Sequence, residues 1–267
     1  MAKRETKKEV YARYNIEYKA GKIYHPVLGW VNPVLINGNA KIGKGCYHYS
    51  ILPTTGGFTV YVNEKEYKLI GTCPTTCRGC YATNGNYRFQ SVKNALGMRT
   101  WLAQNDIDFL KRAIMAQIEA DKIDVLRIHA AGDFFSLAYV EMWRTIAKRF
   151  PDCLMWSYTK KAAAEKAFND IPNINIVKSI VPGFGFNFGH CDYILNVYKA
   201  LKETGKDVYV CKCGTDKEQH CINCGACRKC EHVLFIEHGT EYNAENDAVF
   251  PVLKEIIDKQ ENIALRA

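Results

Sequence analysis

The chain has 267 residues, which suits one large domain or one domain with a small appendage. Hydrophobic residues make up 48% and charged residues 24%, so a full globular core is possible. The formal net charge is +8, and the basic residues 1–22 are either a solvated tail or a segment that touches nucleic acid. We find no secretory signal and no apolar run near the about 18 residues of a membrane span, which excludes a membrane protein and predicts a cytoplasmic one.

Twelve cysteines are the most informative part of the composition. In a reducing compartment, clustered cysteines bind metal more often than they form disulfides. Three of them lie in residues 73–80 and six in residues 211–230. Cys46, Cys153 and Cys191 stand apart from these groups, and we expect them to be small buried hydrophobic side chains.

The pattern of elements changes along the chain. Residues 23–70 carry short apolar stretches punctuated by Asn, Gly and Pro, which predicts strands and turns. Beyond them, helical and strand periodicities alternate. The predicted helices are residues 106–122, 136–150, 160–168, 191–205 and 250–260. In the second, Ser136 is the N-cap and four residues face inward: Leu137, Val140, Trp143 and Ala147. Gly205 marks the end of the fourth. The predicted strands are residues 67–71, 123–130, 153–159, 173–182, 207–211 and 232–239.

This alternation favours parallel βα units in an α/β fold, and a partial (β/α)6 barrel fits it better than a doubly wound sheet. We expect a basic, strand-rich extension in residues 1–64 and the barrel core in residues 65–210. A cysteine-rich module would occupy residues 211–232, and a last strand and helix residues 233–267. Ligands bind at the carboxyl ends of parallel strands, so both cysteine groups should lie on one active face.

The predicted strand 123–130 carries an unusual polar face. Side chains alternate along a strand, so Leu126, Ile128 and Ala130 share one face while Arg127 and His129 share the other. A buried parallel strand is usually apolar on both faces. The two polar residues therefore indicate a polar pocket, or else they pair with buried acids inside a packed barrel.

The first cysteine group is a C-x3-C-x2-C array made of Cys73, Cys77 and Cys80. Thiolates suit zinc or iron–sulfur clusters, and a structural zinc site normally closes with four ligands. His48 or another cysteine would then be needed to complete it. In an iron–sulfur cube the open position can instead bind a substrate or cofactor, and Gly79 lets the loop wrap closely around the cluster.

The second cysteine group contains a C-x2-C-x2-C core typical of ferredoxin loops, although paired C-x2-C spacings also suit a zinc knuckle. Its cysteines are Cys211, Cys213, Cys221, Cys224, Cys227 and Cys230. Basic residues are interleaved with them, as in nucleic-acid-binding modules: Lys212, Lys217, Arg228 and Lys229. The spacing predicts a metal site, with iron–sulfur favoured over zinc.

The first cysteine group resembles that of the radical S-adenosylmethionine (SAM) superfamily, in which C-x3-C-x2-C follows the first strand of an α/β barrel. Gly132 and Asp133 end the second predicted strand and look like a variant of that superfamily's Gly-Gly-Glu motif. The resemblance implies a [4Fe–4S] cluster that chelates SAM and cleaves it to a 5′-deoxyadenosyl radical. One departure is that Gly79 precedes the third cysteine where an aromatic residue is common, while Tyr81 follows it.

Roles for individual residues follow from that resemblance. Asp133, with Gly132, would hold the SAM amine, and Tyr81 would pack on the adenine. The pocket would be lined by four further residues, with Tyr158 as a relay of hydrogen atoms: Arg127, His129, Ser157 and Tyr158. A second, auxiliary [4Fe–4S] cluster and an electron donor such as flavodoxin or ferredoxin would complete the system.

Longer segments resemble the phage-encoded gene product eighty-eight family. They are "NGNAKIGKGCYHYSILP", "TCPTTCRGCYATNGNYRF", "RIHAAGDFFSLAYVEMW" and "YTKK", in that order and followed by a cysteine cluster. The resemblance implies a phage origin, the host cytoplasm, and four ligands in the second group: Cys213, Cys221, Cys224 and Cys227, with Cys211 and Cys230 spare or alternative.

Three functions therefore stay open. The first is a radical SAM-type enzyme whose substrate is a nucleic acid, nucleotide or peptide. The second is a nucleic-acid-binding protein stabilised by zinc or an iron–sulfur cluster. The third is an electron-transfer or sensor protein that holds clusters without SAM.

Overall fold

The computed structural model describes residues 5–39, 42–75, 80–212, 216, 218–237 and 243–260. It contains two compact units. The N-terminal unit comprises Met1–Asn37 and Tyr47–Leu154, and the C-terminal unit comprises Gly38–Cys46 and Met155–Ala267. The division therefore falls inside the segment 65–210 that we expected as one barrel core.

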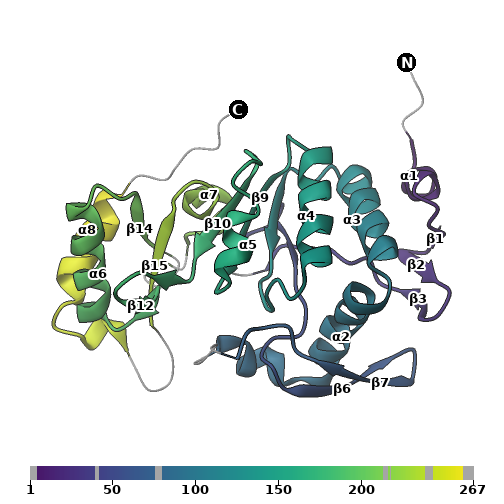
Figure 1. The fold of residues 1–267 in the computed structure, drawn as a ribbon, viewed down its shortest axis with the longest axis horizontal. Coiled ribbons are helices and arrows are strands. Elements are labelled where there is room, and N and C mark those ends of the chain that lie inside the picture. The colour runs from purple at the N-terminus through teal and green to yellow at the C-terminus, as the bar shows by residue number, and fades with distance from the viewer. Residues whose placement is uncertain are drawn as a thin grey trace. The chain divides into compact units, whose positions relative to one another are not determined.

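The N-terminal unit combines helices with short sheets (Figure 1). Its helices are α1 (Lys7–Arg13), α2 (Gln90–Asn105), α3 (Ile107–Asp121) and α4 (Leu137–Arg149), with the 3-10 turns η1 (Tyr81–Thr83) and η2 (Gly85–Arg88). Its strands are β1 (Tyr18–Lys19), β2 (Lys22–His25), β3 (Gly29–Val31), β4 (Ile36–Asn37), β5 (Tyr47–Tyr49), β6 (Gly57–Val62), β7 (Lys65–Ile70) and β8 (Val125–Ile128). β1–β3 form one antiparallel sheet, and β5 lies between antiparallel β4 and parallel β8.

α4 forms as its sequence predicts, with one exception. The Ser136 hydroxyl accepts a hydrogen bond from the backbone N–H of Tyr139 at 3.2 Å, which caps the helix. Val140, Trp143 and Ala147 are buried as expected. Leu137, however, is 84% exposed, because it is the first helical residue and the buried face begins at Tyr139.

The strand ahead of the first cysteine group belongs to a hairpin. β7 pairs antiparallel with β6, and the turn between them places Asn63 and Glu64 at φ +47 and +66. Two consecutive residues with positive φ form the turn that joins two twisted antiparallel strands. The prediction that residues 67–71 begin the parallel series is therefore wrong. β5, only three residues long, provides the parallel neighbour of β8 instead.

The basic start of the chain is folded over the residues that the structure describes, as helix α1 followed by strand β1 and the beginning of β2. Thr6 and Glu9 form a capping box at the beginning of α1. Lys7 pairs with Asp121 of α3, and Arg13 pairs with Glu119 of the same helix. The expectation of a solvated tail is therefore wrong from Lys7 to Arg13, because acidic residues of α3 hold these cations.

The C-terminal unit has short parallel sheets covered by helices. Its strands are β9 (Leu154–Thr159), β10 (Ile174–Lys178), β11 (Ile180–Val181), β12 (Gly185–Phe186), β13 (Phe188–Gly189), β14 (Val208–Val210) and β15 (His232–Ile236). Its helices are α5 (Ala162–Lys166), α6 (Cys191–Glu203), α7 (Cys221–Cys224) and α8 (Phe250–Lys259), with η4 (Ala226–Arg228) and η5 (Ala244–Asn246). β9 runs parallel to β10, and β15 lies between parallel β13 and β14.

The hydrophobic core of the C-terminal unit lies between α6, α8 and the strands β14 and β15 (Figure 1). It includes Cys191, Val197, Leu234 and Leu253, all fully buried. The alternation of strands and helices is present here as predicted, although the predicted strand 173–182 is divided into β10 and β11. The strands of the described residues form several small sheets, and a barrel stays a prediction. None of the described helices is long and apolar enough to cross a membrane.

Candidate functional site

The first cysteine loop begins at a firmly anchored position of the N-terminal unit. The backbone N–H of Thr72 donates to the carbonyl of Leu52, and that of Cys73 donates to the carbonyl of Thr54, both at 3.0 Å. The Thr72 hydroxyl is buried and donates to the same Leu52 carbonyl at 2.9 Å. Cys73 and Cys80 are both partly exposed. Cys77 and Gly79 lie outside the described residues, so the array is placed by its two ends.

The Gly132–Asp133 turn contacts this loop directly. The backbone N–H of Asp133 donates to the Thr72 hydroxyl at 3.2 Å. Gly132 has φ +90, and a Cβ there would lie 2.4 Å from Cγ1 of Ile51 and 2.9 Å from the Thr72 hydroxyl. A side chain cannot fit at that distance, so the close approach requires glycine. The two motifs that sequence reasoning linked are thus neighbours in the fold.

Asp133 stabilises the turn through its own side chain. Its carboxylate is buried, and Oδ1 accepts a hydrogen bond from the backbone N–H of Phe134 at 2.7 Å. Such side-chain-to-backbone bonds are typical of turns that follow a strand. Binding a ligand amine, the role predicted for Asp133, would add to this structural role.

His129 does not share the polar face predicted for Arg127. Its backbone has φ +60, which breaks the strand alternation just after Ile128. The ring packs edge-on to Phe134 and its Nε2 lies 2.8 Å from the Tyr139 hydroxyl. Burial, and to a lesser extent the positive charge of Arg127, lowers the pKa of His129 to about 3. His129 is therefore a neutral side chain of an aromatic cluster rather than a pocket wall.

Tyr81 and Arg127 lie close to the far end of the cysteine loop. The Tyr81 hydroxyl donates to the carbonyl of Ala130, just beyond β8, and its ring packs against Tyr87. Burial, with smaller contributions from Tyr81 and Cys80 and against the opposing charge of Arg127, raises the pKa of Tyr87 to about 12. The predicted residues that the N-terminal unit brings together are thus Cys73, Cys80, Tyr81, Arg127, Gly132 and Asp133.

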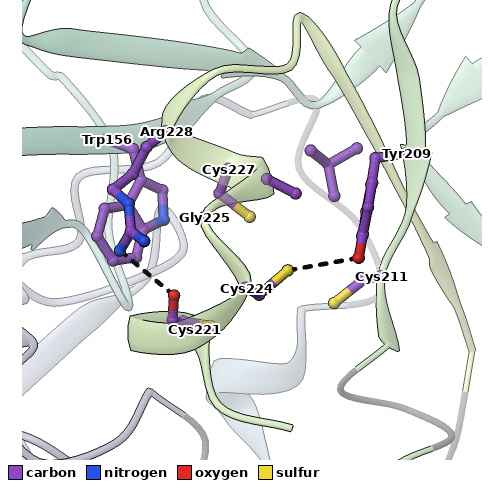
Figure 2. Close-up of a pocket in the computed structure, with 10 residues that line it drawn as sticks. Trp156, Tyr209, Cys211, Cys221, Cys224, Gly225, Cys227 and Arg228 are labelled. Carbon is purple, nitrogen blue, oxygen red and sulfur yellow. Dashed lines mark hydrogen bonds between the residues drawn. The ribbon is translucent and has the colours of Figure 1, made fainter. Parts of the chain in front are cut away.

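A cysteine-lined pocket lies in the C-terminal unit (Figure 2). Four of the predicted cysteines line it: Cys211, Cys221, Cys224 and Cys227. Cys213, predicted as a ligand by resemblance, lies outside the described residues. Local folding explains the gathering of the C-x2-C-x2-C core, because Gly225 ends α7 with φ +74 and η4 begins at once. Asn175 holds the following loop by donating to the carbonyls of Cys227 and Cys230, both at 2.9 Å.

Arg228 is the charged group of the cysteine pocket. Its guanidinium lies 5.7 Å from the ring centre of Trp156 and donates to the carbonyl oxygens of Cys221 at 3.3 Å and Ile222 at 3.2 Å. Its buried Nε has no hydrogen-bond partner among the described residues. Burial lowers the pKa of Arg228, and four cysteines oppose that shift: Cys46, Cys227, Cys221 and Cys224. A buried cation close to thiols favours their thiolate form, which is the form that binds metal.

Cys46 is the residue that sequence reasoning missed. It belongs to the segment Gly38–Cys46, which folds with the C-terminal unit. The backbone N–H of Ile222 donates to the carbonyl of Ile42 at 3.1 Å, and a Cβ on Gly43 would lie 2.8 Å from Cγ2 of Ile222. The segment therefore lies directly on α7. Cys46 is fully buried, as predicted, but no sequence signal indicated its proximity to Arg228.

Three other predicted residues belong to the surroundings of this pocket. The Tyr158 hydroxyl donates to Sγ of Cys227 at 2.7 Å, so Tyr158 is a partner of a thiol. Ser157 is fully buried beside it in β9. Burial, together with Asp207, raises the pKa of the Cys230 thiol to about 12, and the role of Cys230 as a spare or alternative ligand stays a prediction. A shared active face for Ser157, Tyr158 and the first cysteine loop stays a prediction.

The donor set of the pocket fits a thiolate-bound metal. Several thiols face one space, and the unpartnered Nε–H of Arg228 would offset the negative charge of metal thiolates. Among the described residues, no group of three or more His, Cys, Asp or Glu side chains is already arranged to hold one ion. Binding would therefore require cysteine rotamers to change.

Comparison with known proteins points to phage proteins. A family model described as Gene product 88 matches residues 33–180. The "Gene 88 protein" of Mycobacterium phage D29 is 24% identical over 147 residues, which cover 45% of this chain and 61% of that protein. The match therefore spans less than two thirds of the relative. No solved structure matches the chain.

Proposed function

The chain belongs to the Gene product 88 family, and from that premise we propose that it is an iron–sulfur protein and a radical SAM-type enzyme. The observation that carries the proposal is the contact between the two ends of a predicted site. The loop that starts at Cys73 is joined to the Gly132–Asp133 turn through the Thr72 hydroxyl. A three-thiol loop and an acidic turn at the end of a parallel strand are the parts that such a site needs.

Cys73, Cys77 and Cys80 would hold the first [4Fe–4S] cluster. When bound, such a cluster supplies the electron that cleaves SAM reductively, and an electron donor such as flavodoxin or ferredoxin would replenish it. The chain itself would bind and orient SAM. Tyr81, more than half exposed beside Cys80, is available to pack on an adenine ring. Asp133 would orient the amine, with its backbone held by Thr72.

The cysteine pocket of the C-terminal unit would hold the second cluster. Cys221, Cys224 and Cys227 would be its ligands, with Cys46, Cys211 or Cys213 as the fourth. Arg228 would offset the negative charge of the thiolates, and the Tyr158 hydroxyl would hydrogen-bond to Sγ of Cys227. Hydrogen bonds to ligating sulfurs and nearby charges tune cluster potentials. Zinc is the alternative metal for this set of thiols.

Metal analysis is the first test. Protein purified without oxygen and reconstituted with iron and sulfide is expected to bind iron and acid-labile sulfide for two clusters. Cys80→Ala should lose one cluster and Cys224→Ala the other. Cys191→Ser is the matched control, because Cys191 is a fully buried cysteine in the apolar core of the C-terminal unit. A wild-type protein that binds zinc and no iron would overturn the iron–sulfur proposal.

SAM cleavage is the second test. Reduced protein incubated with SAM should produce 5′-deoxyadenosine, detected by mass spectrometry, and Cys80→Ala should not. Iron in both sites without 5′-deoxyadenosine would favour an electron-transfer or sensor protein. Iron-free protein that binds nucleic acid with steep salt dependence would favour the nucleic-acid-binding alternative. Lys7 and Arg13 of α1 already pair with acidic residues, so fewer cations of α1 would be left to contact phosphates.

A further inference from the structure

A buried arginine in the N-terminal unit has no opposite charge beside it among the described residues. Arg99, in α2, is 4% exposed, and its Nε donates to the carbonyl of Ser50 at 2.7 Å. Among the described residues, its side-chain hydrogen bond comes from Nε, and the groups that act electrostatically on it are tyrosines and no carboxylate: Tyr49, Tyr87 and Tyr139. An arginine cannot shed its charge as a buried lysine can, and an unpaired buried cation is costly.

Other polar groups without partners lie on the same side of β5 and its extension. His48 and Ser50 are two residues apart along an extended chain, so their side chains share a face. Both His48 Nδ1 and the Ser50 hydroxyl are buried and have no hydrogen-bond partner among the described residues. Ser50 is 3% exposed. Buried polar atoms are almost always satisfied in native proteins, so several together indicate a missing ligand or water.

The charges around these residues are positive. His48 is the register partner of Arg127 on β8. Arg99 and Arg127 both lie close enough to His48 to act on it electrostatically, and an imidazole ring can both donate and accept a hydrogen bond. Arg127 and Cys80 both act electrostatically on Tyr87, so this region lies near the end of the first cysteine loop.

We propose that Arg99, His48 and Ser50 form a binding site for one oxyanion, a phosphate or carboxylate group of a small ligand, beside the first cysteine loop. The planar fork of a guanidinium matches both groups, and the two terminal nitrogens of Arg99 are the donors that such a group needs. The neutral imidazole and the hydroxyl complete the set of donors. The site needs no bound metal, so it goes beyond the proposed function.

Binding of simple anions to the full chain tests the proposal. Calorimetric titration with sodium phosphate and with sodium acetate, at ionic strength matched with sodium chloride, should show one site for at least one of the two anions. Arg99→Met should weaken binding about tenfold or more, because a charge-assisted hydrogen bond is lost. Lys93→Met is the control, since it removes a cation from the same helix and should leave binding unchanged. Phosphate binding points to a phosphorylated ligand, and acetate binding to a carboxylate.

Thermal unfolding of the same variants separates a ligand role from a structural one. Without added anion, Arg99→Met should unfold at the wild-type temperature or higher, because it removes an unpaired buried charge. Should Arg99→Met fail to fold, Arg99→Lys keeps the charge without the fork and should still weaken binding. Unchanged anion binding in the folded variant, or a wild type that binds neither anion, would overturn the proposal. A protein that takes up no iron on reconstitution but still binds the anion would contradict the proposed function and support this site.

Discussion

The two cysteine regions of the chain are built in different ways. The first is one short loop, whose entry is fixed by backbone hydrogen bonds to Leu52 and Thr54 and by the fit of Gly132 against Thr72. The second collects thiols from the end of β14, from α7 and from η4, and Cys46 of the distant segment Gly38–Cys46 lies close enough to Arg228 to act on it electrostatically. Neighbours in sequence make the first region, and tertiary packing makes the second.

The difference extends to the charge that each region provides. Arg228 lines the second pocket itself and is held over Trp156. In the first region, Arg99 of α2 and Arg127 of β8 act electrostatically on Tyr87, as Cys80 does, and the two described cysteines of the loop are partly exposed. A thiolate site that includes its own cation suits a resident metal, whereas a set of three thiols leaves one metal position for an additional ligand. The three predictions below test this contrast.

The largest effect is expected at Cys46. We expect Cys46→Ser to lose the metal of the second region while the first keeps its own, because Cys46 is a thiol close to Arg228 and contributes from outside the cysteine-rich segment. The measurement is iron and zinc content per chain after anaerobic reconstitution. Cys153→Ser, which alters a cysteine buried in the N-terminal unit, is the control. A Cys46→Ser protein with full metal content would show that residues 211–230 supply all the ligands of the second region.

A smaller effect, on stability, is expected at the first region. Gly132→Ala adds a Cβ that clashes with Ile51 and forces a side chain into φ +90, and together these should cost about 3 kcal/mol of unfolding free energy. Gly21→Ala is the matched control, because Gly21 also has positive φ, at +79, but has open space around it. Its cost should be about 1 kcal/mol. Equal losses in urea unfolding would mean that the contact between the turn and the loop contributes nothing.

The smallest effect concerns acid. The pKa values of His129 and His48 are lowered to about 3 and about 4 in the folded chain, below the 6.5 expected when it unfolds. Their stabilising contribution is therefore fully present above about pH 6.5 and is lost as the pH falls toward the folded values. Between pH 7.5 and 5.5 each histidine should reduce the unfolding free energy by about 1 kcal/mol.

His48→Gln tests that acid effect with little disturbance, because His48 Nδ1 has no hydrogen-bond partner to lose within the part of the chain that the structure describes. Urea unfolding at the two pH values should show a reduced pH dependence for this variant. His190→Gln, at an exposed histidine of the C-terminal unit, should behave as the wild type does. Identical pH dependence in all three proteins would contradict a neutral, buried His48.

Periodicity and capping residues predicted much of the local structure. α3, α4, α6 and α8 begin and end within a residue or two of their predicted limits, because caps such as Ser136 and stops such as Gly205 act locally. Leu137 and His129 were misplaced for local reasons too. The packed face of α4 starts after its first residue, and a left-handed backbone at His129 ends the alternation of β8.

The sequence by itself determined which residues could bind metal and that a turn at Gly132–Asp133 would follow a buried strand, because spacing and alternation are properties of neighbouring residues. Tertiary structure decided which groups meet. It placed Thr72 against Asp133, the segment Gly38–Cys46 on α7, and Arg99 against the carbonyl of Ser50. Such contacts join residues far apart in the chain, and they depend on packing and on the desolvation of charge, which no local pattern encodes.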